Sequence, residues 1–417
     1  MSTRYSTGAV PPARARNRSP DPIADAPVSR LLILVVVSIA TQAMTALIAF
    51  TTPLMAVEAA PDFGVAAEAA GLFMTVIFVV AMLSAAAGGG VIARFGAIRT
   101  TQLCLLLCAA GIVLMLPGSA PLALAGAMLI GAGYGPVTPA SSHLLAPVTS
   151  ERSRPFVFSV KQTAVPVGAA CAGLLVPQMI GLGGWRAAVL AVAGIVLAVA
   201  AAVQPFRASY DADRNRSARL RLDIHRAVAG AFARPRLREL CLLSFAFAAV
   251  QLCFGAYFVT FLVERQGMTL VAAGIAFTVG QVCGIGFRIL WGAVAERALS
   301  ARVLLVLLAV LMAAASAATL ALSPGWPLAA IAGLAALFGA SAVAWNGLYL
   351  AEIVRVTSIE ESAAVTGGAL FFTFGGMTVG PAAFGAMLAS GASYGVAFTV
   401  TGAVALLAAL PLLRSDR

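Results

Sequence analysis

The sequence predicts an all-α membrane protein with twelve transmembrane helices, arranged in two six-helix bundles related by a pseudo-twofold axis. Composition gives the first reason, because apolar residues make up 61% of the 417 residues and charged residues only 10%. A soluble domain has about a quarter of its residues charged, so this chain cannot cover a water-facing surface with polar groups. Twelve apolar runs, and one polar stretch between the sixth and the seventh, give the other two reasons.

Each apolar run is about as long as a helix must be to cross a bilayer, whose hydrocarbon core takes roughly 20 residues. The first six runs are Leu31–Met55, Ala69–Ile92, Thr100–Pro117, Pro121–Leu145, Pro155–Met179 and Ala187–Val203. The second six runs are Glu239–Val263, Leu270–Val294, Val303–Leu322, Trp326–Ala351, Ala363–Met387 and Val396–Leu413. They do not alternate between polar and apolar residues as barrel strands of about ten residues do, so helices are expected.

The arginine-rich polar stretch divides the chain into two halves. We expect five parts: a disordered cytoplasmic tail at 1–30, a first bundle at 31–206, a basic cytoplasmic linker at 207–238, a second bundle at 239–413 and a short tail at 414–417. The first tail is rich in Arg, Pro and Ser and lacks the apolar segment of a signal peptide. Within the linker, 220–232 fits either a basic amphipathic helix on the membrane surface or a solvated connection.

Basic residues fall almost entirely on one side of the membrane. If the amino terminus lies inside, the tails and the loops on that side carry 23 of the 27 basic residues. The opposite loops carry only Arg186 and Arg265. Because basic loops stay on the cytoplasmic side, both termini are expected in the cytoplasm, with the protein in a bacterial inner membrane.

The remaining composition argues against other classes of protein. The net charge of +11 is accounted for by the loops, so it does not indicate nucleic-acid binding. The six cysteines lie in apolar runs and fit packing positions, and with two histidines the chain has no spacing typical of a metal site. No nucleophile–base set or phosphate loop indicates an enzyme, and no cofactor is expected.

Polar residues are unevenly spread over the twelve runs. The third, sixth, ninth and twelfth runs are nearly pure aliphatic, whereas the others carry the amides, the tyrosines and the buried charges. This is a three-helix unit used four times, which is typical of transporters built from repeats. A short internal repeat agrees, since residues 89–99 after the second run match residues 292–302 after the eighth at an offset of 203.

The repeated loop carries a recognisable motif. Its residues are Gly89, Arg94 and Gly96 in the first copy, and Gly292, Glu296 and Arg297 in the second. With six spans on either side of a basic central stretch, the whole chain resembles the major facilitator superfamily, whose signature in both loops is Gly-x3-Asp-Arg-x-Gly-x-Arg. The sequence Gly184-Trp185-Arg186 before the sixth run is also similar to that family.

The resemblance implies that these loops latch the two halves together at their cytoplasmic ends. The first copy departs from the signature, with Ala93 where the acid is expected. The second copy keeps an acid, Glu296, but has Leu299 in place of the glycine. The missing acid puts the first latch in doubt, so the latch at Glu296 and Arg297 is expected to matter more.

Two basic residues lie inside apolar runs. Lys161, the only lysine, is six residues into the fifth run, and Arg288 is six residues from the end of the eighth. Both are therefore about 9 Å along the helix from the cytoplasmic side. A charge at membrane depth costs roughly 2.5–3.5 kcal/mol on insertion scales and marks a functional candidate.

The superfamily places the fifth and eighth helices opposite each other, so we expect Lys161 and Arg288 to bracket an anionic substrate. Arginine offers a two-pronged fork to a carboxylate, and lysine a point charge. The run Arg288–Glu296 also resembles the eighth helix of the oxalate/formate antiporter and monocarboxylate transporter families, which implies an arginine that binds the substrate carboxylate. Two alternatives stay open: both side chains can extend to the headgroups, and Arg288 can pair with Glu352.

Other polar residues in the runs either line a substrate site or form hydrogen bonds between helices. The candidates for substrate binding are Gln162 next to Lys161, Asn346 and Tyr349 in the tenth run, and Gln42, Tyr134 and Gln251 in the first, fourth and seventh. No acid lies inside a run, which argues against a cation exporter. Glu352 and His143, both near the cytoplasmic end, are the candidates for coupling to protons.

The sequence therefore predicts a secondary active or facilitative transporter that moves a small organic anion, a carboxylate, across the cytoplasmic membrane by alternating access. A monomer is expected, in contact with the lipid bilayer and its small-molecule anionic substrate. The alternative is an efflux pump for neutral or hydrophobic drugs with an apolar cavity.

Overall fold

The computed structural model describes residues 28–149, 154–212, 214–215, 217, 234–356 and 362–413, which include all twelve apolar runs. Every regular element within these ranges is a helix. The expected tail at 1–30, except for its last three residues, the tail at 414–417 and the expected surface helix at 220–232 lie outside the described residues.

The first half of the chain forms six spans. Its elements are α1 (Val28–Phe63), η1 (Ala67–Ala69), α2 (Ala70–Phe95), α3 (Ala97–Val113), α4 (Ala120–Leu145), η2 (Ala146–Val148), α5 (Arg154–Lys161), α6 (Ala164–Ala202), η3 (Gln204–Phe206) and α7 (Arg207–Tyr210). The fifth span consists of α5 and the first part of α6. The sixth is the rest of α6, because the backbone leaves helical geometry at Gly183 and at Gly184, where φ is +75°.

A polar cluster fixes the break in α6. Asp62, at the end of α1, accepts hydrogen bonds from the Trp185 indole N–H at 2.9 Å and from the Arg186 Nη1 at 2.7 Å. Arg186 also lies over the Trp185 ring, at 4.3 Å from its centroid. The Gly184-Trp185-Arg186 sequence thus forms the corner that turns the chain from the fifth span into the sixth.

The second half also forms six spans. Its elements are α9 (Pro235–Gln266), α10 (Leu270–Arg297), α11 (Ala301–Ala318), η4 (Thr319–Ala321), α12 (Leu328–Phe338), η5 (Gly339–Val343), α13 (Asn346–Val356), α14 (Ser362–Ala389), α15 (Tyr394–Ala409) and η6 (Leu410–Leu413). The π-helical segment η5 lies between α12 and α13, and the three together form one span.

The helices confirm the twelve spans expected from the sequence. Within the described residues, ten helices are long and apolar enough to cross a membrane, and the bent pair Ala87–Phe95 and Ala97–Val113 adds an eleventh. The twelfth follows from the break in α6, which divides one long helix into two spans. The helices extend beyond the apolar runs, as in Val28–Phe63 against the expected Leu31–Met55, since a helix continues past the hydrocarbon layer.

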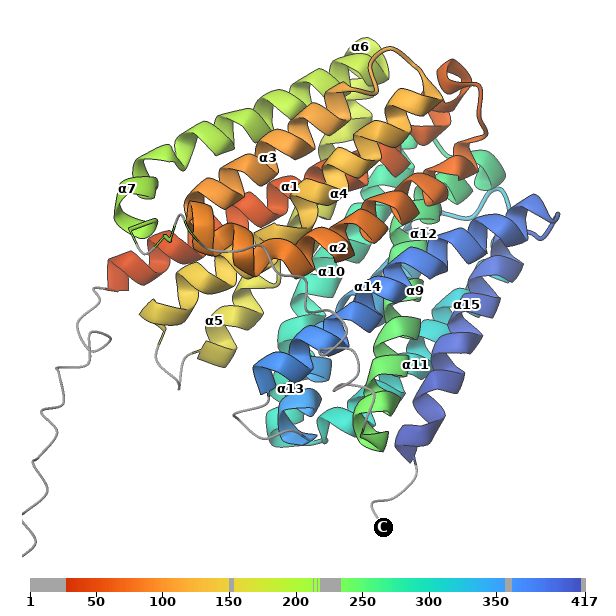
Figure 1. Cartoon of the computed structure of the whole chain (residues 1–417). Helices are drawn as coiled ribbons and strands as arrows, with labels where there is room; N and C mark the ends of the chain where they lie inside the picture. The colour runs from red at the N-terminus through yellow and green to blue at the C-terminus, as the bar shows by residue number, and fades with distance from the viewer. Residues whose placement is uncertain are drawn as a thin grey trace, which may run out of the picture.

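The two halves form two bundles that lie side by side (Figure 1). Among the described helices, the pairs that pack across the boundary include α1 with α9, α2 with α14, α2 with α9, and α6 with α10. In Figure 1 the ribbons of α1–α6 and α9–α15 run close together at the upper right and spread apart toward the lower left. We name the latter side, where the described chain begins at Val28 and ends at Leu413, the termini end, and the opposite side the far end.

Glycines let the two bundles touch at the far end. A side chain at Gly274 of α10 would overlap the carbonyl oxygen of Gly173 in α6, so the two backbones lie in direct contact. Next to this crossing, the Thr278 hydroxyl donates to the Ala170 carbonyl at 3.2 Å. Between lipid-embedded helices, small residues of this kind provide close van der Waals packing in the absence of a hydrophobic driving force.

Replacing Gly274 by alanine is expected to disfavour this conformation. The added methyl group meets backbone rather than a movable side chain, and such overpacking costs about 1–3 kcal/mol. Spin-label distances between the bundles at the far end should therefore lengthen. Gly286→Ala is the matched control on the same helix, because a methyl group there meets no described atom within 4 Å. Unchanged far-end distances in Gly274→Ala would show that this contact does not set the conformation.

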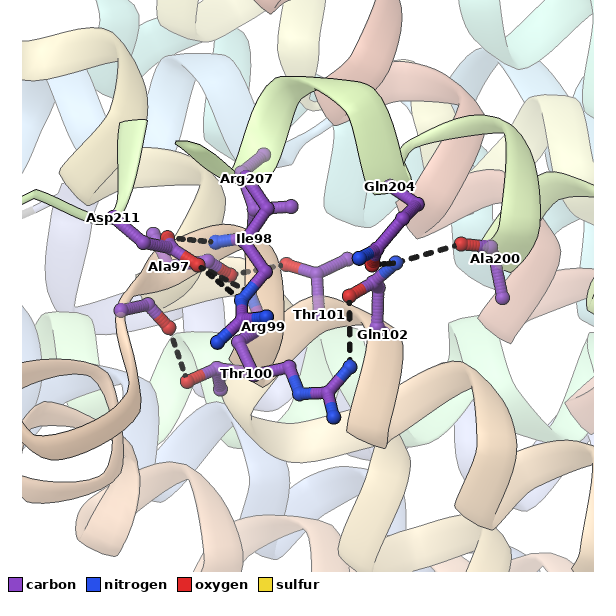
Figure 2. Close-up of polar contacts among 11 residues, drawn as sticks. Ala97, Ile98, Arg99, Thr100, Thr101, Gln102, Ala200, Gln204, Arg207 and Asp211 are labelled. Atoms are coloured by element: carbon purple, nitrogen blue, oxygen red, sulfur yellow. Dashed lines mark hydrogen bonds and ion pairs between the residues drawn. The ribbon is translucent and has the colours of Figure 1, made fainter. Parts of the chain in front are cut away.

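An acid from beyond the sixth span holds the loop between α2 and α3 (Figure 2). Gly96 joins these helices at φ +89°, and its lack of a side chain leaves room for the Asp211 carboxyl group. Asp211 accepts from the backbone N–H of Ile98 at 2.8 Å and of Arg99 at 3.0 Å. These amides belong to the first turn of α3, which has no carbonyl partners of its own. An acid thus lies at this loop although Ala93 lacks one.

The Asp211→Ala variant is expected to lose about 1 kcal/mol of stability, the usual effect of removing a helix N-cap, because two amides of α3 lose their acceptor. The measurement is the Tm of the purified protein in detergent. Asp211→Asn keeps one acceptor oxygen, so its Tm should lie between that of the wild type and that of Asp211→Ala. Equal Tm values for all three proteins would show that Asp211 does not stabilise the loop.

The other motif residues make few contacts. Arg94 lies over the Phe95 ring at 5.7 Å. Glu296 and Arg297 are exposed, and neither forms an ion pair within the described part of the chain. Gly89 and Gly292 have open space where a side chain would lie.

Candidate functional site

Lys161 ends α5 and is buried, with 1% of its surface exposed. Its Nζ donates to the Thr138 carbonyl at 2.9 Å and to the Ser142 hydroxyl at 2.8 Å, both in α4. The Phe158 ring lies 5.6 Å away on the same helix. The side chain therefore points into the first bundle and does not extend to the headgroups, which was one of the two alternatives. An ammonium group has three donors, so one is left beyond these two hydrogen bonds.

Arg288 lies in α10 and is 8% exposed. Its Nη1 donates to the Gln162 carbonyl of the first bundle, and its Nη2 to the Val343 carbonyl of the second, both at 2.6 Å. Its Nε is buried without a partner among the described residues. The alternative pairing with Glu352 is wrong, because Glu352 forms hydrogen bonds with Arg355 at 2.6 and 2.9 Å, one helical turn away.

Both acceptors of Arg288 lie at breaks in a span. Gln162 follows the last residue of α5, and α6 begins two residues later. Val343 ends the π-helical η5, just before α13 begins at Asn346. Irregular backbone at membrane depth is tolerated where its polar groups find partners within the protein, and π-helical turns are frequent at functional sites. One cation thus joins two broken spans from opposite bundles.

An amide occupies equivalent places in the two bundles. Gln42 of α1 donates to the Thr138 hydroxyl of α4 at 3.1 Å. Gln251 of α9 accepts from the Trp345 indole N–H at 3.0 Å and from the Asn346 amide at 3.5 Å. Gln251 follows Gln42 by 209 residues and Asn346 follows Thr138 by 208, close to the offset of the repeated loop. Each bundle therefore ties its first helix to its fourth with one amide.

The structure groups the predicted residues into two clusters. Lys161 and Gln42 meet at Thr138 in the first bundle, whereas Gln251, Asn346 and Tyr349 surround Trp345 in the second. Tyr134 is half-buried, with its ring 5.3 Å from that of Phe78, and no described hydrogen bond joins it to either cluster. Gln162 contributes its carbonyl to Arg288.

Sequence reasoning missed Thr138, Ser142 and Trp345. The signal for the first two was a Thr-Pro-Ala-Ser-Ser segment at 138–142, which is unusually polar for an apolar run. Trp345 is fully buried against Phe247, and its indole N–H needs an acceptor there. A tryptophan next to Asn346 in the middle of a span was the available sign.

The profile of the Major Facilitator Superfamily matches residues 31–381. The chain belongs to this superfamily. In the comparison with curated proteins, no sequence matches.

Solved structures share the fold of this superfamily member at low sequence identity. A POT family transporter in complex with 5-aminolevulinic acid has a TM-score of 0.73 and 11% identity, over 91% of this chain and 95% of its own. A point mutant of the nucleoside transporter NupG has a TM-score of 0.71 and 12% identity, over 92% and 99%. A POT family transporter with a thioalcohol-conjugated peptide has a TM-score of 0.74 and 12% identity, over 91% and 95%. These similarities establish the fold.

The superfamily member's two candidate coupling residues differ in their surroundings. Glu352 is 4% exposed and is neutralised by its ion pair with Arg355. His143 is exposed near the end of α4. Within the described ranges, no group of three His, Cys, Asp or Glu residues could hold a metal ion.

Proposed function

We propose that this superfamily member is a secondary transporter of a small organic anion with a carboxylate group. One observation carries the proposal: each bundle holds a buried cation, Lys161 or Arg288, and among the described residues both donate hydrogen bonds only to neutral oxygen atoms. A buried charge without a counter-charge is costly even when it is hydrogen-bonded. An anion bound between the bundles would supply that counter-charge.

The donors suit a carboxylate. Arg288 has a planar fork and an Nε–H without a partner among the described residues, and Lys161 has one donor beyond its two hydrogen bonds. The amides of Gln42, Gln251 and Asn346 would then orient the remainder of the substrate. Glu352 and His143 are proposed as the groups that couple transport to protons. This part of the proposal is secondary to the two cations, since Glu352 already has a basic partner.

Transport would follow alternating access, with the bundles at 31–206 and 239–413 rocking about the site between them. We place the termini end in the cytoplasm of a bacterium, because the basic loops lie on that side. Two features then support an inward-facing state: the far-end glycine contact, and the lack of an ion pair at Glu296 and Arg297 within the described chain, which leaves the second latch open. A monomer contains both cations and the complete site.

A thermal-shift screen tests the proposal. Purified protein is heated with lactate, oxalate, succinate and benzoate, and with the corresponding neutral amides as matched controls. A ligand at about 100 times its Kd stabilises by about 2.7 kcal/mol, so a binding carboxylate should raise the Tm and its amide should not. Uptake of the stabilising anion into proteoliposomes then establishes transport. Stabilisation by neutral hydrophobic drugs alone would favour the alternative, a drug efflux pump.

A further inference from the structure

The carbonyl group of Gln162 lacks an intrahelical partner for a reason written in the sequence. In a continuous helix it would accept from the N–H four residues on, but that residue is Pro166, which has no N–H. Gln162 and Thr163 form a turn between α5 and α6. The carbonyl accepts from Arg288 of the opposite bundle instead, at 2.6 Å. By leaving the Gln162 carbonyl without a donor in its own helix, Pro166 makes this carbonyl available for a hydrogen bond between the bundles.

The second acceptor belongs to the same bundle as Arg288. Val343 ends η5, and the Trp291 indole N–H donates to another η5 carbonyl, that of Ala340, at 2.7 Å. Arg288 and Trp291 are three residues apart, so both lie on the face of α10 that meets η5. Among the described residues, the hydrogen bonds to Val343 and Ala340 therefore join α10 to η5 inside the second bundle. Of the two bonds that Arg288 donates, the one to Gln162 crosses between the bundles.

A carboxylate that binds Arg288 through two hydrogen bonds competes with one of these carbonyls for the guanidinium group. A bidentate carboxylate takes two neighbouring N–H groups, and every such pair includes Nη1 or Nη2. Each Nη carries two hydrogens and already donates one of them to a carbonyl at 2.6 Å, so a carboxylate oxygen on the same nitrogen is repelled by the carbonyl oxygen beside it. Nε has no partner within the described chain. An anion that also reaches Lys161 must lie near Gln162, the residue that follows it.

We propose that the Gln162 carbonyl holds, in the substrate-free protein, the place on Arg288 that a substrate carboxylate takes, and that Pro166 therefore sets the affinity of the site. Binding exchanges a neutral bridge between the bundles, Gln162 to Arg288, for a charged one, Lys161 to anion to Arg288. This inference rests on the proposed function for its substrate, but the bridge itself is a property of the substrate-free protein.

The bridge is tested without any ligand by a double-mutant cycle on the Tm of the purified protein. Pro166→Ala returns an N–H to position 166, so the Gln162 carbonyl gains a partner inside its own helix. The Tm loss caused by Arg288→Met should then be clearly smaller in the Pro166→Ala background than in the wild-type background. Pro166→Ser, which also restores the N–H, should repeat the result if the alanine variant folds poorly.

Pro177→Ala is the matched control. It removes a buried proline from the same helix, but the carbonyl that Pro177 leaves free, that of Gly173, faces Gly274 and not a cation. Its effect should be additive with that of Arg288→Met. If the Tm changes caused by Pro166→Ala and Arg288→Met are additive, the proposed hydrogen bond between Gln162 and Arg288 is overturned.

The second arm measures binding of lactate, oxalate, succinate and benzoate. Pro166→Ala should bind the stabilising anion at least threefold more tightly than the wild type, because the competing carbonyl is engaged elsewhere, and Pro177→Ala should not. An unchanged Kd in Pro166→Ala would overturn the proposal that the Gln162 carbonyl competes with the carboxylate for Arg288. If the wild type binds none of these anions, the proposed function fails for them, while the double-mutant cycle still decides whether the bridge exists.

Discussion

Arg288→Lys lowers anion uptake by at least tenfold, and Arg288→Met abolishes it. Lysine keeps the charge but loses the fork, so it cannot hold the Val343 carbonyl and present a pair of donors to a carboxylate at the same time. A hydrogen bond to a charged group contributes about 1.5–3 kcal/mol, and about 1.4 kcal/mol is a factor of ten. Uptake of the stabilising carboxylate into proteoliposomes is the measurement.

Arg265→Lys is the matched control for this prediction. Arg265 also belongs to the second bundle, but it is exposed in the last turn of α9, where it lies over the Tyr394 ring at 5.9 Å, away from the two clusters. Its uptake should stay within twofold of the wild type. Full uptake by Arg288→Lys and Arg288→Met, at normal expression, would remove Arg288 from the substrate site.

Lys161→Met is expected to abolish uptake without lowering stability. Methionine fills a similar volume without a charge, and removing a buried charge that has no counter-charge relieves its desolvation cost, so the Tm should hold or rise. The loss of uptake then reports the missing counter-charge for the substrate. A residue with a purely structural role would show the reverse pattern, with a lower Tm and residual uptake.

The single lysine offers a second readout. Lys161 is the only lysine, so mass spectrometry of the peptide that contains it reports its modification by an amine-reactive reagent without interference from another lysine. The stabilising carboxylate should protect Lys161 from modification, whereas its neutral amide should not. Ser142→Ala, which removes one of its two acceptors, should retain part of the uptake. Labelling of Lys161 in the substrate-free protein that the carboxylate leaves unchanged would contradict direct contact.

Most of the fold could be predicted because the apolar composition of the chain determines where its helices lie. Apolar runs must be helical in a bilayer, so the twelve spans and their order followed from counting residues. The Gly183–Gly184 break was implied by the gap between the fifth and sixth runs. Two interruptions inside spans were not predicted, at Gln162 and at Gly339–Val343. Hydrophobic counting cannot detect them, since a broken helix is as apolar as a straight one.

The candidate site was predictable only in its charges. Lys161 and Arg288 could be found because a cation inside an apolar run is rare. Their partners could not, because the Thr138 and Val343 carbonyls are backbone groups that exist at every residue. Pro166 marks the Gln162 carbonyl as free, but not the side chain that binds it. Pairing of Arg288 with Glu352 was left open as an alternative, and the structure turns Glu352 toward Arg355, three residues away on its own helix. The rotation of a helix about its axis decides such pairings.

The far-end contact makes α10 a lever. Gly274 touches the other bundle, and Arg288 lies fourteen residues further along the same helix, about 21 Å away. If the bundles turn about that contact by roughly 15°, the size of a known rigid-body subunit rotation, Arg288 moves by about 5 Å. A hydrogen bond of 2.6 Å cannot survive such a displacement. The hydrogen bond between Arg288 and Gln162 therefore exists only within a narrow range of angles between the two bundles, and its presence reports that angle.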